Sequence, residues 1–392
     1  MSRRLALVVQ RYGPEVAGGS ESLARAVGER LAGSGDDVTV FTSCALDYVT
    51  WRNELAPGET VEGGVRVRRF PVAQERDLAA FNRFAEALYV RPHGTEDELE
   101  FLERQGPVVP GLLEALEREK ADFDAVVFFT YLYHPTFWGL RAAGERALLV
   151  PTTHDEPPLR LRVFEEVFAR PRALAFLTPA EEALVRARFD VSGRPAAVAG
   201  MGIDPPAAPP DVAGFRRRHA LEGPYVAYAG RIDAGKGCHE MVSAHARYRA
   251  SGGQATLVLL GRLAMELPKG DGVRYLGYVD EADKWAAYAG AAAVVCPSPY
   301  ESLSIALLEG FAVGTPALAN ARSAVLLDHC LRSNGGLFYE GADEFVECLD
   351  VLVRDEPVRA ALGQAGRRYV AAEYRWNVVL DRYRSLIAAA AR

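Results

Sequence analysis

The chain has 392 residues, of which 49% are hydrophobic and 9% aromatic, so it is large enough for two packed globular domains. Its formal net charge is −7, and this excess of acidic residues argues against nucleic acid as the main partner. No apolar run reaches the roughly 18 residues that a membrane-spanning helix needs, so we expect no transmembrane segment.

The first half of the chain alternates apolar runs with helical patterns. Residues 4–9 predict a buried strand, since this run is too short for the core of a signal peptide. We expect Ser20 to cap a helix that follows, and residues 38–42 to form the next strand, which together predict a parallel sheet. Residues 77–120 are charged and are expected to be largely helical. Further strands are expected at residues 65–70, 125–129, 147–151, 173–177 and 196–198.

A proline-rich stretch at residues 205–210 predicts a linker between two domains. We therefore expect one domain over residues 1–205 and a second over residues 206–375. Strands of the second domain are expected at residues 225–229, 256–260, 273–276, 293–296 and 315–318. Each half is typical of an α/β fold with a doubly wound parallel sheet, in which ligands bind at the carboxyl ends of the strands.

Two glycines, Gly18 and Gly19, lie at the turn between the first strand and the first helix. Glycine has no Cβ, so the backbone of this turn can approach a phosphate or an acceptor closely. Arg11, Tyr131 and Tyr133 follow strands of the same half, and we interpret them as candidate acceptor contacts.

A glycine-rich loop, residues 230–237, follows the first strand of the second domain and carries Arg231 and Lys236. Only four lysines occur in the whole chain, so a lysine here is not incidental. Two fixed cations on one loop can stabilise the charge that develops on a departing diphosphate. The pattern also matches a Walker A loop, but Gly237 replaces the Ser or Thr that would hold Mg²⁺, which disfavours a nucleoside triphosphatase.

Two glutamates, Glu301 and Glu309, lie eight residues apart on either side of a predicted helix start. Ser302 and Ser304 are natural N-cap residues for that helix. Eight helical residues span roughly 12 Å at about 1.5 Å each. A nucleotide sugar across this helix start could therefore place its hexose near Glu301, its diphosphate at the first backbone N–H groups and its ribose near Glu309.

Together these two motifs resemble the Arg/Lys loop and the Glu-x7-Glu motif of retaining GT-B glycosyltransferases, specifically glycosyltransferase family 4. The resemblance covers most of the chain. It implies two Rossmann-like domains that face one another across a cleft, the first binding the acceptor and the second the donor. It also implies that a C-terminal helix over residues 376–392 crosses back onto the first domain.

The resemblance also implies roles for single residues. In similar enzymes the first glutamate contacts the donor sugar, the amides after it hold sugar hydroxyls and phosphate, and the second glutamate binds the ribose. Carried over, these are Glu301, the amides of Ser302, Leu303 and Ser304, and Glu309. The family often has Gly-Phe-Gly where this chain has Ser-Leu-Ser, so the donor sugar is not assigned.

Two further positions follow from the same resemblance. His154 lies on a loop just after a strand, and in similar enzymes such a histidine lies beside the donor sugar, with its backbone carbonyl facing the reacting carbon. We expect Asp155 to orient this loop. Val279 ends a segment, residues 276–279, that is similar to the one whose main chain binds the nucleobase.

The activity implied is transfer of a hexose from a UDP- or GDP-type sugar to a glycan, glycolipid or small-molecule acceptor. Retention of the anomeric configuration and independence of metals and other cofactors are implied as well. Two alternatives stay open. A GT-B nucleotide-sugar epimerase would turn over its substrate without an acceptor, and a non-catalytic nucleotide-sugar binding protein would bind without transfer.

Five scattered cysteines, none in a CxxC pair, fit reduced thiols in a cytoplasmic protein better than disulfides or a zinc site. Four arginines between residues 160 and 172 form a local basic cluster. We interpret this cluster as a solvated or paired helix face, with peripheral membrane contact as the less favoured alternative.

Overall fold

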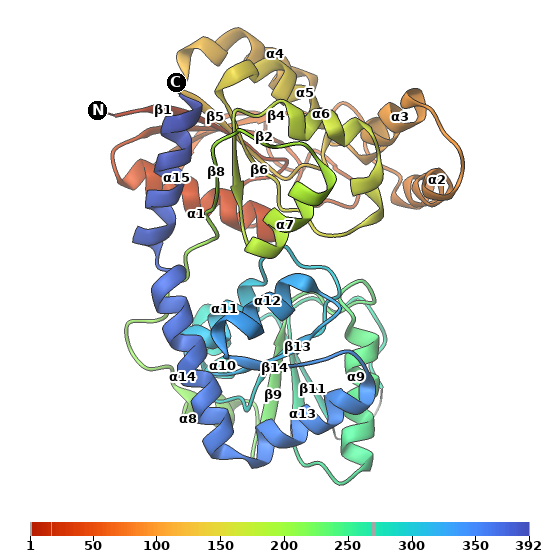
Figure 1. The fold of residues 1–392 in the computed structure, drawn as a ribbon, viewed down its shortest axis with the longest axis vertical. Coiled ribbons are helices and arrows are strands. Elements are labelled where there is room, and N and C mark those ends of the chain that lie inside the picture. The colour runs from red at the N-terminus through yellow and green to blue at the C-terminus, as the bar shows by residue number, and fades with distance from the viewer. Residues whose placement is uncertain (1, 17, 269–271, 392) are drawn as a thin grey trace. The chain divides into compact units, whose positions relative to one another are not determined.

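The computed structural model describes residues 2–16, 18–268 and 272–391 (Figure 1). The chain divides into two compact units: unit 1 comprises Met1–Met201 and Val379–Arg392, and unit 2 comprises Gly202–Val378. The expected division after residue 205 lies close to the observed one. The last helix, α15 (Trp376–Ala390), begins in unit 2 and continues into unit 1.

Unit 1 is built on an eight-stranded sheet with the order β3-β4-β2-β1-β5-β6-β7-β8. All neighbouring strands are parallel except β3, which is antiparallel to β4. The strands are β1 (Arg4–Val8), β2 (Asp37–Ser43), β3 (Gly58–Glu62), β4 (Val65–Phe70), β5 (Ala125–Phe129), β6 (Ala147–Val150), β7 (Ala173–Phe176) and β8 (Ala196–Val198). Every residue of the central strand β5 is buried, as expected for a strand covered by helices on both faces.

The helices of unit 1 follow the strands in chain order. They are α1 (Gly19–Gly33), α2 (Leu78–Val90), α3 (Thr95–Gln105), α4 (Pro110–Glu119), α5 (His134–Ala143), α6 (Val163–Ala169) and α7 (Pro179–Arg188). Short 3-10 helices occur at Lys120–Asp122, Gly144–Arg146 and Pro157–Arg160. The expected helical insertion at residues 77–120 is therefore confirmed as α2, α3 and α4.

One local expectation for unit 1 was wrong, and one strand was not predicted. Helix α1 begins at Gly19, and Ser20 does not cap it, because its hydroxyl donates to the neighbouring Glu21 carboxylate instead. Strand β3 was not expected, since its residues are mostly polar and exposed and lack the alternation that predicts a half-buried strand. It forms because β4 offers it an unpaired edge.

The arginines between residues 160 and 172 all have partners within unit 1. Arg162 lies 3.6 Å from Glu98, Arg160 lies 3.7 Å from Asp155, and Arg170 pairs with Glu166 one helical turn earlier. Arg172 donates to the Ala389 carbonyl of α15 at 3.2 Å. Among the described residues, the structure has no helix with both the length and the apolar character that crossing a membrane requires.

Unit 2 is built on a six-stranded parallel sheet with the order β11-β10-β9-β12-β13-β14. Its strands are β9 (Tyr225–Ala229), β10 (Thr256–Leu260), β11 (Val273–Gly277), β12 (Val294–Cys296), β13 (Ala317–Asn320) and β14 (Gly336–Tyr339). Its helices are α8 (Val212–Arg218), α9 (Cys238–Ala250), α10 (Glu281–Ala289), α11 (Ile305–Ala312), α12 (Ala324–Ser333), α13 (Ala342–Arg354) and α14 (Glu356–Glu373). The short edge strand β14 was not expected.

Both sheets are doubly wound, so each has one place where the strand order reverses. In unit 1 this place lies between β1 and β5, and in unit 2 between β9 and β12. The loops that leave the carboxyl ends of two such strands diverge and leave room for a ligand. In unit 2 these are the loop of Arg231 and Lys236, which follows β9, and the loop of Glu301, which follows β12.

Candidate functional site

The two loops at the reversal point of unit 2 are packed against one another at Gly237. This residue is left-handed, with φ 71°, and a Cβ built on it would lie 2.4 Å from the Pro297 carbonyl oxygen. Any side chain here would be strained by its backbone conformation and would clash with the facing loop. Gly237 therefore lets the loop of Arg231 and Lys236 pack directly against the loop that carries Glu301.

Lys236 and Glu301 form an ion pair between these loops. The Lys236 Nζ lies 2.8 Å from the Glu301 Oε1, although 65 residues separate them in sequence. The lysine side chain is 35% exposed and the glutamate side chain 18%, so the pair remains accessible to a ligand. The structure thus brings these two candidate residues within hydrogen-bonding distance of one another.

Arg231 pairs with Asp233, a residue of its own loop. The other carboxylate oxygen of Asp233 accepts a hydrogen bond from the Lys236 backbone N–H at 2.9 Å. The Tyr228 hydroxyl donates to the Arg231 carbonyl at 2.6 Å. Asp233 thus shapes the turn that carries both cations. Its position between them in sequence was the only signal that could have indicated this role.

Glu309 is paired with a residue that the sequence analysis missed. The Lys284 Nζ, from α10, lies 2.8 Å from the Glu309 Oε1 and 3.0 Å from the Glu281 Oε1. Burial raises the pKa of Glu309, while Lys284 and the Tyr288 hydroxyl lower it again. Two of the four lysines of the chain therefore neutralise the two motif glutamates.

The start of α11 differs from the expectation that a serine caps it. Ser304 occupies the N-cap position, but it is left-handed, with φ 66°, and its hydroxyl makes no capping bond. A left-handed serine is uncommon, and such strain often occurs in ligand-binding loops. Ser302 and Ser304 are half-buried, and Leu303 between them is buried.

Val279, the expected nucleobase residue, is half-buried and lies between β11 and α10. This position is also at the carboxyl edge of the sheet of unit 2. Asp280 follows it and caps α10 through a hydrogen bond from the Asp283 backbone N–H at 2.8 Å. The loops after β9, β11 and β12 thus all leave the sheet on the edge where a parallel sheet binds ligands.

His154 lies in unit 1 on the loop that follows β6. Its Nε2 lies 3.3 Å from the Glu156 Oε2, and its carbonyl accepts from the Glu156 backbone N–H at 2.8 Å. Tyr131 donates to the other Glu156 oxygen at 2.8 Å. The expectation that Asp155 orients this loop is not supported by the contacts, because Asp155 is exposed and lies 3.7 Å from Arg160.

A second carboxylate contacts the loop of His154 through Thr153. Glu181 of α7 is buried and accepts hydrogen bonds from the Thr153 backbone and hydroxyl and from the Leu177 backbone. Burial raises the pKa of Glu181 to about 7, against the opposing effect of these hydrogen bonds. Glu156 and Glu181 therefore position the loop of His154. Glu156 follows His154 by only two residues, whereas the contact of Glu181 with Thr153 depends on tertiary packing and is not identifiable from sequence.

The two glycines before α1 have different environments. A Cβ on Gly18 would lie 2.1 Å from the Glu21 Oε2, whereas a Cβ on Gly19 would meet no heavy atom within 4 Å. The Glu21 carboxylate is buried and held by Arg11 and by Gln10. The Glu21 carboxylate therefore leaves no room for a Cβ at position 18, whereas position 19 has room for one.

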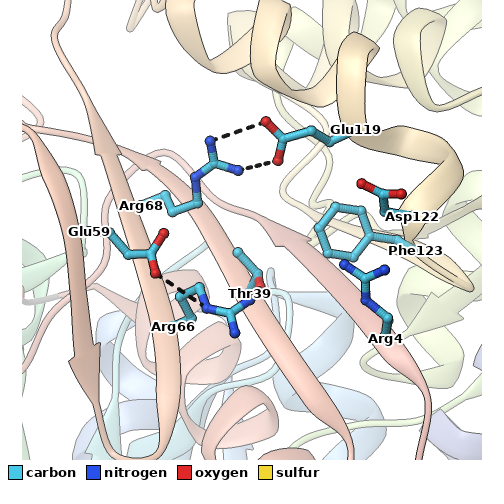
Figure 2. A pocket seen from close by; sticks show the side chains of 8 residues that line it. All are labelled: Arg4, Thr39, Glu59, Arg66, Arg68, Glu119, Asp122 and Phe123. Carbon is cyan, nitrogen blue, oxygen red and sulfur yellow. Dashed lines mark hydrogen bonds and ion pairs between the residues drawn. The ribbon is translucent and has the colours of Figure 1, made fainter.

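A polar pocket of about 400 Å³ lies elsewhere in unit 1, near the amino ends of β1 and β4 (Figure 2). Its three arginines face three carboxylates, and Figure 2 shows the Arg66–Glu59 and Arg68–Glu119 pairs. It is lined by Arg4, Thr39, Glu59, Arg66, Arg68, Glu119, Asp122 and Phe123. None of these residues was expected to be functional, and their charges balance.

No group of three or more His, Cys, Asp or Glu side chains among the described residues is arranged to hold a metal ion. The five cysteines form no disulfide.

Comparison with known proteins finds similarity to glycosyltransferases. Residues 214–369, which contain both loops of unit 2, match the model of the glycosyl transferases group 1 family. Glycogen synthase of Thermus thermophilus is 34% identical over 133 residues, which are 32% of this chain and 30% of that protein. D-inositol 3-phosphate glycosyltransferase of Frankia alni is 27% identical over 98% of both chains.

The extent of these matches varies. The chain spans 30% of the Thermus enzyme and 52% of a GDP-mannose-dependent mannosyltransferase of Corynebacterium glutamicum, to which it is 27% identical. Sucrose-phosphate synthase of Thermosynechococcus elongatus superposes with a TM-score of 0.72 at 22% identity, covering 99% of this chain and 100% of that one. Solved structures of this kind confirm the predicted fold class, two parallel-sheet α/β domains of the GT-B type.

Proposed function

We propose that this protein is a glycosyltransferase of the group 1, GT-B kind that uses a nucleoside-diphosphate sugar. The carrying observation is the pair of lysine–glutamate contacts at the reversal point of unit 2, Lys236 with Glu301 and Lys284 with Glu309. Side chains that can hold a diphosphate, a sugar and a ribose are thereby gathered on one edge of one sheet. The family match over residues 214–369 supports the same conclusion.

The donor would lie along the start of α11. Lys236 and Arg231 would bind the diphosphate, Glu301 the sugar hydroxyls and Glu309 the ribose hydroxyls. The amides of residues 302–304 would complete the diphosphate and sugar contacts, and the main chain at Val279 would contact the base. The Lys236 side chain is 35% exposed, and its ammonium would gain the charge of a phosphate in exchange for that of the carboxylate, so a diphosphate could replace Glu301 as its partner.

Transfer would proceed through an oxocarbenium-like transition state as the bond from the anomeric carbon to the diphosphate breaks. The leaving oxygen gains negative charge, which Arg231 and Lys236 stabilise without a bound metal. The acceptor hydroxyl would attack from the same face, its proton passing to a diphosphate oxygen, so the anomeric configuration is retained. This is the chemistry of glycosyltransferase family 4. The family resemblance also assigns His154, Gly18 and Gly19 of unit 1 to the site, as expected from the sequence.

The relatives suggest candidate substrates. One solved neighbour, from Anabaena, is a complex with UDP-glucose, and the Corynebacterium relative is GDP-mannose-dependent, so both UDP and GDP donors belong in a first screen. Relatives are also named for D-inositol 3-phosphate and for a phosphatidylinositol mannoside, which are suitable first acceptors. We place the reaction in the cytoplasm, where the five unpaired thiols would stay reduced.

The test is a thermal-shift screen of UDP- and GDP-sugars, followed by a transfer assay in EDTA with the product analysed by NMR. A ligand at a hundred times its dissociation constant stabilises the native state by about 2.7 kcal/mol, which such a screen detects. We expect one donor class to bind and its sugar to be transferred with retention. Turnover of the donor without an acceptor would instead indicate an epimerase, and tight binding with neither transfer nor hydrolysis a binding protein.

A further inference from the structure

A fully buried histidine lies directly behind the loop that carries Glu301. His329 belongs to α12, has an exposed fraction of 0%, and uses both ring nitrogens. Its Nε2 lies 2.8 Å from the Leu303 carbonyl oxygen, and its Nδ1 lies 3.1 Å from the Tyr369 hydroxyl. None of the expected site residues is His329, and the proposed function does not use it.

The protonation of this ring follows from its partners. Burial lowers the pKa of His329 to about 4, so the ring is neutral at pH 7 and carries one proton. A carbonyl oxygen can only accept, so that proton is on Nε2 and points at Leu303. Nδ1 must then accept, which makes the Tyr369 hydroxyl its donor.

The ring is also held in one orientation. Tyr369 lies edge-on to it, with ring centroids 5.9 Å apart, and Tyr374 lies at the same distance. Arg332 donates to the Tyr369 oxygen at 3.1 Å, and the Tyr374 hydroxyl, 3.4 Å from the same oxygen, can donate to it as well. With Nδ1 of His329 as the acceptor, the Tyr369 proton is directed at the ring. The imidazole is therefore a fixed hydrogen-bond donor aimed at a single backbone carbonyl.

The bond to Leu303 determines where the next amide points. The Leu303 carbonyl and the Ser304 N–H belong to one planar peptide unit, in which they point in opposite directions. His329 holds the carbonyl on the interior side, so the Ser304 N–H faces away from the core. Among the described residues no hydrogen-bond acceptor takes that N–H. The positive φ of Ser304 shows that the peptide unit is held against the usual backbone preference.

We infer that His329 is a positioning residue for the sugar-binding loop: through the Leu303 carbonyl it fixes the peptide unit whose Ser304 N–H donates to the nucleotide sugar. The inference rests on the proposed function, because it assigns a ligand to this amide. His329 itself does not contact the donor. Its contribution is to keep a strained peptide plane preset before the donor arrives, which removes an ordering cost from binding.

Two matched variants separate this role from simple packing. In His329→Gln the side-chain amide nitrogen reaches about as far as Nε2 and can still donate to Leu303. In His329→Asn the amide reaches only the Nδ1 position, so it can accept from Tyr369 but leaves the Leu303 carbonyl without its donor. Both variants lose the ring and its packing against the tyrosines, so each controls for the other.

The measurements are the melting temperature, the affinity for UMP and GMP, and kcat and KM for the nucleotide sugar that wild type uses. We expect similar melting temperatures for the two variants. Nucleoside monophosphate affinity should be unchanged, because the Ser304 N–H would donate to the sugar or to the phosphate that carries it, and a monophosphate lacks both. His329→Gln should keep kcat/KM for the donor within about threefold of wild type. His329→Asn should lose about tenfold, the typical effect of one net hydrogen bond.

Equal donor kinetics in the two variants at equal folded fraction would overturn the inference. So would a parallel loss of monophosphate and donor affinity, because that pattern indicates general damage to unit 2. Tyr369→Phe provides a second test if both His329 variants fold poorly. It removes the donor to Nδ1 and should lower donor kcat/KM by about threefold without changing monophosphate binding. If wild type itself binds and transfers no nucleotide sugar, the proposed function fails instead, so the two failures are distinguishable.

Discussion

Replacement of Lys284 with methionine is expected to leave the Glu309 carboxylate inside unit 2 without its counter-ion. Methionine keeps the unbranched apolar stem of lysine and removes only the ammonium group, so packing around the stem is retained. The removed group lies 2.8 Å from the Glu309 Oε1. The variant therefore isolates the charge at the centre of the proposed ribose site.

The expected magnitude follows from burial. Removal of one partner from a buried ion pair typically costs about 3–5 kcal/mol. Here the lysine side chain is 22% exposed and the glutamate side chain 12%, so water partly screens the remaining charge. We therefore expect a loss of about 2 kcal/mol, which is equivalent to about 4–8 °C in melting temperature for a unit of this size.

The loss should depend on pH in a defined direction. Burial raises the pKa of Glu309, and without Lys284 that pKa must rise further. Below pH 4.5, the ordinary value for a glutamate, the carboxyl is neutral in both folded and unfolded chains and the variant should lose little. The deficit should then grow as the pH increases through the folded pKa, where the buried group must ionise.

Urea denaturation followed by circular dichroism measures this loss. A matched double variant, Lys284→Met with Glu309→Gln, removes both charges and should recover most of the lost stability. A double-mutant cycle then gives the pair's coupling energy, which we expect to exceed about 1 kcal/mol. A loss below about 0.5 kcal/mol in Lys284→Met, or no recovery in the double variant, would refute the structural reasoning.

Three further outcomes are expected. Lys236→Ala and Glu301→Ala should each lower the transfer rate at least about tenfold to a hundredfold, and near-normal turnover in both would rule out the site. Gly237→Ala should lower the free energy of unfolding in urea by more than about 1 kcal/mol, because its Cβ would meet a backbone oxygen at 2.4 Å. Gly19→Ala has open space around its Cβ and should change the same free energy by no more than about 0.5 kcal/mol. The pKa of Glu181 is raised to about 7, so its ionisation destabilises the folded state. As the pH rises from 4.5 to 7, the free energy of unfolding of wild type should fall by up to about 3 kcal/mol relative to that of Glu181→Gln. Parallel pH profiles of unfolding free energy in the two proteins would contradict this.

Much of the fold was predictable because its strands are buried on both faces. Strands such as β5 and β9 are continuous apolar runs bounded by turn residues, and sequence patterns detect these well. The strands that were missed, β3 and β14, both lie at sheet edges. The exposed β3 lacks an apolar pattern, and β14 is an apolar run of only four residues, too short to distinguish from a loop. The cap at Ser304 was wrong because the tertiary contact at Leu303 overrides the local preference of a serine.

The candidate site was predictable only where its residues lie on recognisable loops. The spacing of Glu301 and Glu309 and the cations of the loop at 230–237 are visible in sequence. Their partners are not, because Lys284 and His329 reach the site from separate helices. Only folding places these side chains within hydrogen-bonding distance, and no spacing rule encodes such contacts.

We expect the loops after β9 and β12 to bind a nucleoside diphosphate through Lys236. Calorimetric titration of UDP and GDP into wild type and Lys236→Met, at low and high salt, tests it most directly. The account predicts one site for one of the two nucleotides in wild type, with affinity at least about tenfold weaker in the variant and a salt dependence that the variant reduces. Equal affinity and equal salt dependence in the two proteins, or no binding of either nucleotide to wild type, would contradict it.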